Sequence, residues 1–312
     1  MSERPLLSIV TPCYNEEANV DELYSRVKAA LANETAYDFE FIFIDNHSED
    51  ATVEKVKALI ARDPSVKLIV NARNFGHIRS PYYGILQSSG VATVYLASDL
   101  QDPPELIPQF IRAWEEGYKL VLAVKPVSKG PAWVHALRRA YYHFLDGISD
   151  FTLVKDSTGF GVYDRSVLDH LRKINDPYPF LRGLICELGF EVKTIEFTQP
   201  RRLRGISKNN FYTLYDIAML GIVSHSKVPL RIAAFAGFAI GVISMLIAMV
   251  YFFLKLIYWD AFPLGMAPLM IGLFFLLGMQ MLFIGILGEY VAAIHTYVQK
   301  RPVVVEKERI NF

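Results

Sequence analysis

Residues 91–105 read VATVYLASDLQDPPE, and this stretch decides the fold class. The apolar run at 91–96 predicts a β-strand, which the following proline pair ends. Asp99, Gln101 and Asp102 therefore follow a strand directly, at the end where open α/β sheets bind their ligands. Carboxylate and amide oxygens suit a hard divalent cation, which usually accompanies a phosphorylated substrate. Taken alone, an Asp-x-x-Asp pair is more often a solvated turn, so the rest of the chain has to support a metal site.

Strand and helix signals alternate through the first hundred residues. The apolar, β-branched runs predict strands at 6–11, 39–44, 66–70 and 91–96, and helical patterning separates them at 17–33 and 48–62. This rhythm predicts an α/β domain with a doubly wound, mostly parallel sheet. No strand leads into a G-x-G-x-x-G fingerprint, which argues against a dinucleotide-binding domain.

The composition limits the choice of partner and compartment. There are 32 Lys and Arg residues against 32 Asp and Glu residues, so no basic field points to nucleic acid. Cys13 and Cys186 lie in apolar sequence without metal-like spacing, which predicts reduced core cysteines in a protein that faces the cytosol. The N-terminus leads straight into the first strand, and we expect no signal peptide.

Two long runs near the C-terminal end, 232–254 and 264–288, carry no charged residue. At about 1.5 Å per residue, each can cross a hydrocarbon core about 30 Å thick, whereas buried core helices are the alternative. Basic residues flank the pair, which places both flanks in the cytoplasm; they are Lys227, Arg231, Lys300, Arg301, Lys307 and Arg309. We expect an interfacial amphipathic segment at 211–231, a hairpin of two transmembrane helices joined by 255–263, and a cytoplasmic tail at 289–312.

An ordered set of short motifs extends over nearly the whole chain. It consists of SIVTPCYNEEANV (8–20), FIFIDNHSEDAT (41–52), NARNFGH (71–77), SDLQDPPE (98–105), the R-x-x-G-x-S-K run (202–208) and LGEY (287–290). Together these motifs resemble the family 2 glycosyltransferases. More narrowly, the chain is similar to polyprenyl-phosphate glycosyltransferases: dolichol-phosphate mannosyltransferases, bactoprenol glucosyltransferases and undecaprenyl-phosphate aminoarabinose transferases. The resemblance implies a GT-A domain, the fold of nucleotide-diphospho-sugar transferases, over residues 1–210.

The resemblance also implies where the nucleotide sugar binds. The family's nucleotide-contacting positions fall on Pro12, Tyr14, Glu16 and Asp45, and its diphosphate-binding basic loop falls on Arg202 and Lys208. The family commonly has D-D-G-S where this chain has Asp45-Asn46-His47-Ser48, so the contacts to the base differ. For the cations at 201–208, contact with anionic lipid is the alternative to diphosphate binding.

The loop after the fourth expected strand is implied to hold Mg²⁺ or Mn²⁺. Asp99 and Gln101 match the second acid and the glutamine of the family's D-x-D-x-Q motif, whereas the first acid is Ala97 here. Magnesium is commonly held by one or two carboxylates plus substrate phosphates. Asp99 with help from Gln101 or Asp102 therefore suffices for the expected site.

The implied reaction needs little acid–base machinery. A phosphate monoester is mostly anionic near neutral pH, because its second pKa is about 6. Catalysis then consists of aligning this nucleophile with the anomeric carbon and stabilising the departing diphosphate. Asp99, Arg202 and Lys208 are the expected catalytic residues. Arg138 or Arg139 is implied to receive the lipid phosphate, with a solvated helix face as the alternative for that pair.

We therefore expect an inverting transferase that moves a sugar from a nucleotide-diphosphate sugar to an undecaprenyl-type polyprenyl phosphate. The reaction is expected at the cytoplasmic face of a bacterial inner membrane, in a homo-oligomer such as a tetramer. Two alternatives stay open. One is a processive polysaccharide synthase, although residues 109–114 do not match the spacing of its Q-x-x-R-W motif. The other is a noncatalytic membrane scaffold that retains the fold, which Ala97 suggests.

Overall fold

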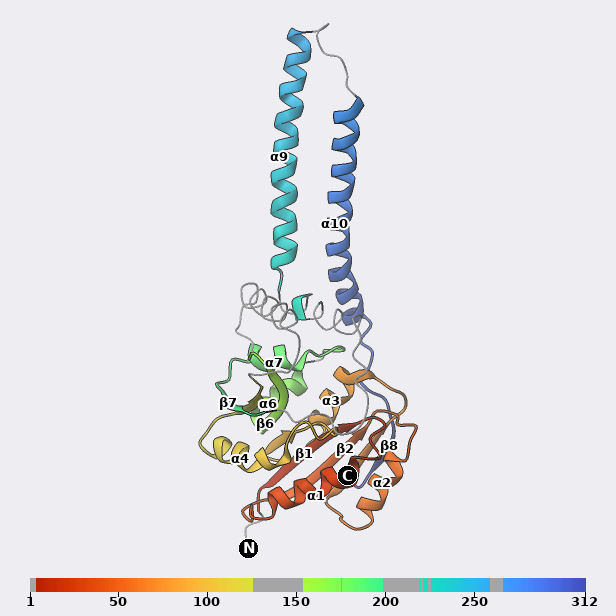
Figure 1. Ribbon diagram of the computed structural model, residues 1–312, viewed down its shortest axis with the longest axis vertical. Coiled ribbons are helices and arrows are strands. Elements are labelled where there is room, and N and C mark those ends of the chain that lie inside the picture. Colours follow the sequence, from red (N-terminus) through yellow and green to blue (C-terminus); the bar gives the residue numbers. More distant parts are fainter. Residues whose placement is uncertain are drawn as a thin grey trace. The chain divides into compact units, whose positions relative to one another are not determined.

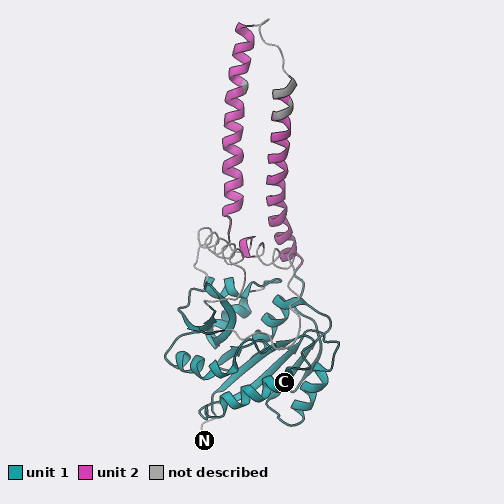
Figure 2. Cartoon of the chain, viewed as in Figure 1, with its two compact units in different colours: residues 1–146, 151–214, 300–312 teal, residues 147–150, 215–299 magenta. Residues whose placement is uncertain are grey.

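The computed structural model describes residues 4–125, 154–174, 176–198, 219, 221–223, 226–258 and 266–312. The chain divides into two compact units (Figure 2). Unit 1 comprises residues 1–146, 151–214 and 300–312, and unit 2 comprises residues 147–150 and 215–299. The last residues of the sequence thus belong to the same unit as the first.

Unit 1 contains a sheet whose described strands run in the order β7-β5-β6-β4-β1-β2-β3-β8 (Figure 1). The strands are β1 (Leu6–Cys13), β2 (Asp38–Asp45), β3 (Val66–Asn71), β4 (Ala92–Tyr95), β5 (Leu120–Val124), β6 (Ser157–Asp164), β7 (Val192–Glu196) and β8 (Glu306–Ile310). β1 pairs in parallel with both β2 and β4, and β2 pairs in parallel with β3. β6 runs antiparallel to β4, and β8 runs antiparallel to β3. The predicted doubly wound, mostly parallel sheet is confirmed.

Helices cover both faces of this sheet. The α-helices within the described residues of unit 1 are α1 (Val20–Leu31), α2 (Thr52–Ile60), α3 (Gly76–Leu86), α4 (Ile107–Glu115), α6 (Arg165–Lys173) and α7 (Leu181–Glu187). Apolar residues of α1, α2 and α4 pack in one core cluster, and those of α3, α6 and α7 pack in a second. Consecutive residues of β2 alternate between them, with Phe41 and Phe43 in the first cluster and Ile42 and Ile44 in the second. A strand buried on both faces is continuously apolar, which is why its sequence signal was strong.

The stretch expected to be a tail, 289–312, divides between two elements. Helix α10 (Met266–Val298) continues to residue 298, and β8 then pairs along β3, with Leu68 opposite Ile310. The Asn311 side chain also donates hydrogen bonds to the carbonyl oxygens of Pro64 and Val66, at 2.6 and 2.8 Å. The sequence EKERI at 306–310 lacks the alternation of apolar and polar residues that is typical of a half-buried strand, so the sequence pattern did not predict β8. Charged side chains are common on strands at a sheet edge.

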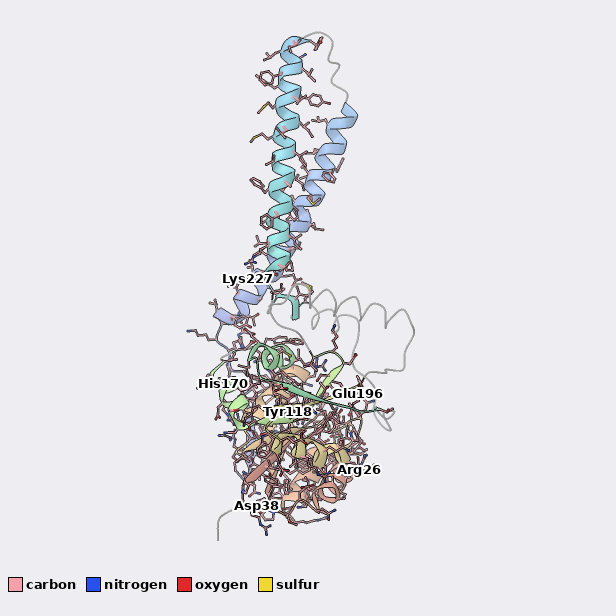
Figure 3. All side chains as sticks on the ribbon, turned by 90° about the vertical axis from the view of Figure 1, so that its left-hand side faces the viewer. Arg26, Asp38, Tyr118, His170, Glu196 and Lys227 are labelled. Carbon is pink, nitrogen blue, oxygen red and sulfur yellow. The ribbon has the colours of Figure 1, made fainter. Side chains whose placement is uncertain are left out.

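Unit 2 contains the helices α9 (Val228–Ile257) and α10, which include most of the two charge-free runs. Both helices contain a segment long and apolar enough to cross a membrane, Val228–Ile257 and Gly272–Val298, and these segments are almost entirely unburied. The apolar side chains of α9 project outward around the helix (Figure 3). Near the ends of the pair, the Tyr290 hydroxyl donates to the Ser226 carbonyl oxygen at 2.7 Å.

Glu40 joins the beginnings of several strands. Its side chain on β2 is only 3% exposed, and it accepts hydrogen bonds from Lys67 Nζ on β3 at 2.7 Å and from Ser8 Oγ on β1. It also accepts from Ser89, just before β4, through the backbone N–H and the hydroxyl, both at 2.8 Å. Burial alone raises the pKa of Glu40, but these hydrogen bonds outweigh it and lower the pKa below its ordinary value. The folded protein therefore favours the carboxylate form of this residue.

We expect Glu40→Ala to lower the free energy of unfolding by about 3 kcal/mol, because it leaves a half-buried cation and two hydroxyls without their acceptor. Urea unfolding of the detergent-solubilised protein measures this loss. The matched control is Lys55→Ala, which breaks an exposed pair with Asp21 and is expected to cost about 1 kcal/mol or less.

Lowering the pH should remove the contribution of Glu40 to the free energy of unfolding of the wild-type protein. The pKa of Glu40 is lowered on folding, so its contribution is complete above the unfolded pKa of about 4.3 and is lost as the pH falls through the folded pKa. Glu40→Gln should consequently lose less stability than the wild type between about pH 5 and pH 3. Equal acid sensitivity in the two proteins would contradict the ionised state assigned to Glu40.

Candidate active site

The candidate site lies at the carboxyl ends of β1, β2 and β4. β1 is hydrogen-bonded to β2 on one side and to β4 on the other, so the loops after all three strands emerge along one edge of the sheet. The chain continues from β1 into α1 on one face, whereas α3, on the other face, leads towards β4. Open α/β sheets bind ligands at such a switch point, because neighbouring loops there diverge and leave a crevice.

The loop after β1 is bonded to the loop after β2. The backbone N–H of Asn15 donates to Ser48 Oγ, and the N–H of Glu16 donates to Thr52 Oγ1, both at 2.9 Å. In return, the N–H of Glu49 donates to Asn15 Oδ1 at 2.9 Å. Asn15 has a φ of 57°, a left-handed conformation that asparagine tolerates better than most residues. The structure thus brings together four predicted nucleotide-binding residues: Pro12 and Asp45 near the ends of neighbouring strands, and Tyr14 and Glu16 in the loop after β1.

Asp45 ends β2 and is fully buried. One carboxylate oxygen accepts the backbone N–H of Ser48 at 2.9 Å, and the other accepts the Ser48 hydroxyl. Burial raises the pKa of Asp45, and the bonds from Ser48 oppose that rise. His47, within this turn, has a φ of 68°, at the position where the resembled family has glycine. Asp45 therefore already shapes the turn that would face a nucleoside.

Asn46 fixes the next loop, and the sequence reasoning did not anticipate this role. Its Oδ1 accepts from Asn71 Nδ2 at 3.0 Å and from the backbone N–H of Phe75 at 2.9 Å. Its Nδ2 donates to Asn74 Oδ1 at 2.9 Å and to the Gly76 carbonyl oxygen at 3.3 Å. The motif 71–77 was visible in the sequence, but its bonding to Asn46 depends on the parallel register of β2 and β3.

The two carboxylates of the predicted metal loop differ in burial and in their hydrogen-bond partners. Asp99 Oδ1 accepts the backbone N–H of Gln101 at 3.1 Å, and its side chain is only partly buried. Asp102 is 4% exposed, and its Oδ2 accepts the N–H of Ala97 at 3.2 Å. Burial, with a smaller contribution from the nearby Asp99 carboxylate, raises the pKa of Asp102 to about 7, whereas the hydrogen bond from the N–H of Ala97 opposes this rise. Leu100 between them has a φ of 58°, so the loop is sharply folded.

Several predicted site residues fall outside the described residues. These are the acceptor-phosphate candidates Arg138 and Arg139 and the diphosphate candidates Arg202 and Lys208. Within the described chain, no cluster of three or more His, Cys, Asp or Glu side chains has metal-binding geometry. Cys13 is buried and Cys186 is partly buried, and neither forms a disulfide.

The sequence profile of the family described as glycosyl transferase family 2 matches residues 8–172, which contain most of β1, all of β2 to β4 and the metal loop. The chain belongs to this family. Membership identifies it as a glycosyltransferase with the GT-A fold, as predicted. Cys13, Asn46 and the carboxylates described above all lie inside the matched region.

Relatives match this glycosyltransferase from end to end. The uncharacterized glycosyltransferase YkcC of Bacillus subtilis is 33% identical over 98% of this chain and 94% of its own. The prophage-derived bactoprenol glucosyl transferase of Shigella flexneri is 29% identical over 97% of both chains. Among solved structures, the mannosyltransferase PcManGT of Pyrobaculum calidifontis, in complex with GDP-Man and Mn²⁺, covers 96% of this chain and 88% of its own at 13% identity, with a TM-score of 0.46.

Asn46→Asp tests the hydrogen bonds assigned to the Asn46 amide. The new carboxyl would face Asn74 Oδ1 and the Gly76 carbonyl oxygen, to which only its protonated form can donate, so folding raises its pKa above about 3.9. A group with a raised pKa destabilises the fold as the pH rises. We therefore expect a loss of about 2 kcal/mol near neutral pH that largely disappears at about pH 4, measured by thermal unfolding.

Asn46→Ala is the control, because it introduces no titratable group. Relative to wild type, its loss of stability should be the same at both pH values. A loss independent of pH in Asn46→Asp would show that the amide donors have been assigned incorrectly.

Proposed function

We propose that this glycosyltransferase moves a sugar from a nucleotide-diphosphate sugar to a polyprenyl phosphate of the undecaprenyl type. The observation that carries the proposal is the end-to-end match to bactoprenol glucosyl transferases, which includes both the strand-end loops and the two long apolar helices. A lipid acceptor requires a protein that reaches the membrane, and a nucleotide donor requires a cytoplasmic site. One chain here combines elements suited to both.

The reaction is a single displacement. An anionic oxygen of the acceptor phosphate attacks the anomeric carbon, the bond from that carbon to the diphosphate oxygen breaks, and the nucleoside diphosphate leaves with the bonding electrons. Because the nucleophile is already deprotonated, no general base is needed. Attack on the face opposite the leaving group inverts the configuration at the anomeric carbon. The protein's task is alignment and stabilisation of the leaving charge.

The loops after β1 and β2 are suited to the nucleoside. They are bonded to each other through Asn15, Glu16, Ser48 and Thr52, so Tyr14 and Glu16 are presented from a fixed backbone. Preorganisation of this kind reduces the ordering that a bound donor has to impose. Asp45 shapes the same turn, and we propose that the base or ribose lies against it.

The metal loop is suited to a divalent cation that arrives with the donor. Asp99 and Asp102 carry the hard oxygen ligands that such a cation prefers. Burial of Asp102 beside Asp99 raises the pKa of Asp102, and a bound cation would offset this by stabilising the ionised carboxylate. We propose that Asp99, with Gln101 or Asp102, holds Mg²⁺ or Mn²⁺ together with the diphosphate. When bound, the ion neutralises negative charge on the departing diphosphate. Arg202 and Lys208 are proposed to contact the same group, and Arg138 or Arg139 the acceptor phosphate.

Transfer to lipid is the direct test of this function. Membranes that contain the protein, incubated with a panel of radiolabelled nucleotide sugars, should transfer label from one of them into an acid-labile lipid. Asp99→Asn should lower this transfer by roughly 100-fold or more, because it removes the charged ligand. Ala97→Asp, which restores the family's first acid, is the matched variant and should keep activity or need less metal.

Unfolding temperatures equal to that of wild type would confirm that both variants fold. Full activity of Asp99→Asn would remove the metal loop from the mechanism. Label in a polymer rather than in lipid would favour a processive synthase instead.

We also propose that both flanks of the helix pair lie in the cytoplasm. Residues 151–214 precede α9 and residues 300–312 follow α10, and both segments belong to unit 1. If each helix crosses the membrane once, the chain must return to the side from which it entered, as the pairing of β8 with β3 requires. The basic flanks place that side in the cytoplasm.

Cysteine substitution tests this topology. A membrane-impermeant thiol reagent added to intact cells should label Asp260→Cys and should not label Lys307→Cys, because only the link between the helices is outside. Permeabilised cells provide the control, since exposed position 307 should then react. Labelling of Lys307→Cys in intact cells would contradict the hairpin.

A further inference from the structure

Arg182 is a cation that the proposed function has not used. It lies in the first turn of α7, is exposed, and makes one hydrogen bond with the described residues, from Nη2 to the Thr158 carbonyl oxygen at 3.4 Å. It forms no ion pair with a carboxylate in the described part of the chain. Some other arginines of unit 1 do have such partners; for example, Arg26 pairs with Glu105, and Arg172 pairs with Asp169.

The contact with Thr158 places Arg182 beside the metal loop. Thr158 is the second residue of β6, which runs antiparallel to β4 with Gly161 opposite Tyr95. The first residues of β6 therefore lie next to the loop that follows β4. Gly159 confirms this proximity, because a Cβ atom there would be 3.6 Å from Cε1 of the Tyr95 ring.

The charge of Arg182 acts on groups from several elements around this edge. Burial raises the pKa of Tyr95, at the end of β4, and the Arg182 guanidinium opposes that rise. Burial lowers the pKa of His77, at the start of α3, and the guanidinium lowers it further. Arg182 thus lies beside the metal loop, and among the described residues only its Nη2 has a hydrogen-bond acceptor.

We propose that Arg182 binds a phosphoryl group of the reactants, either the diphosphate of the nucleotide sugar or the phosphate of the acceptor. This proposal rests on the proposed function, in which every reactant at this edge is phosphorylated. The planar guanidinium offers donors in a fork that matches two phosphate oxygens. A compact ammonium carries the same charge without that fork, so lysine is a partial substitute only.

Kinetics and binding together test this role. We expect Arg182→Ala to lower kcat/KM for transfer by roughly 100-fold, and Arg182→Lys to recover part of that loss. Arg182→Gln is an additional variant that retains a donor towards Thr158, in case the alanine variant is unstable. The matched control is Arg62→Ala, which removes an exposed arginine just before β3 begins, at the edge of the sheet opposite the carboxyl ends of the strands. This variant should leave kcat/KM within about twofold.

Two binding measurements distinguish the two phosphates. If Arg182 contacts the donor diphosphate, Arg182→Ala weakens binding of the nucleoside diphosphate about tenfold in the absence of acceptor. If it contacts the acceptor, nucleotide binding is unchanged and the affinity for a short prenyl phosphate falls instead. Either result supports the proposal.

Values within twofold of wild type in both binding assays and in kcat/KM would overturn it. The two proposals fail separately. A wild-type protein that transfers no sugar to lipid would refute the proposed function, whereas the binding assays would still decide whether Arg182 holds a phosphoryl group.

Discussion

The pairing of β1 with β2 on one side and with β4 on the other is the constraint on which the site depends. The chain adds β2 and β3 outward from β1, then returns to the opposite edge of β1 to form β4. Its connecting helices α1 and α3 consequently lie on opposite faces near this point, so the loops after β1 and β4 diverge. Residues some eighty positions apart in sequence, Tyr14 and Asp99, are therefore presented at one edge. The Glu40 carboxylate links the same strands near their amino ends through hydrogen bonds to Lys67 and Ser89. These bonds help to fix the strand register that aligns the loops at the carboxyl ends.

The candidate site carries fewer carboxylates than the D-D-G-S and D-x-D-x-Q motifs that are common in the family. Ala97 replaces one acid of the metal motif, and Asn46 replaces another after β2. An amide at position 46 both accepts and donates, which lets it hold Asn71, Asn74 and Phe75 without placing a second carboxylate beside Asp45. For a ligand as anionic as a nucleotide diphosphate, fewer nearby carboxylates mean less repulsion. They also mean a weaker isolated metal site, so we expect the cation to bind with the nucleotide rather than before it.

The parts of the fold that the sequence predicted are those whose signal is local. β1 to β4 are apolar on both faces, and each lies within two residues of its predicted range. The acidic loop and the nucleotide loops followed from their positions at strand ends. β8 was missed because Glu306–Ile310 is mainly charged and gains its strand conformation only from pairing with β3. The proposed role of Arg182 and the hydrogen bonds of Asn46 were missed for a related reason, because both depend on contacts that are distant in sequence, with Thr158 and with residues 71–76.

The position of β8 has a consequence for how the protein is made. A ribosome completes β1 to β7 before either long helix, but it synthesises residues 306–310 only after both. Until then the outer edge of β3 presents unpaired backbone groups, which favour association with other extended chains. The sheet of unit 1 is thus completed last, after both long helices have been synthesised. If those helices enter a membrane, as we propose, any delay in their insertion prolongs the exposure of β3, so aggregation of unit 1 and failure of insertion are expected to occur together.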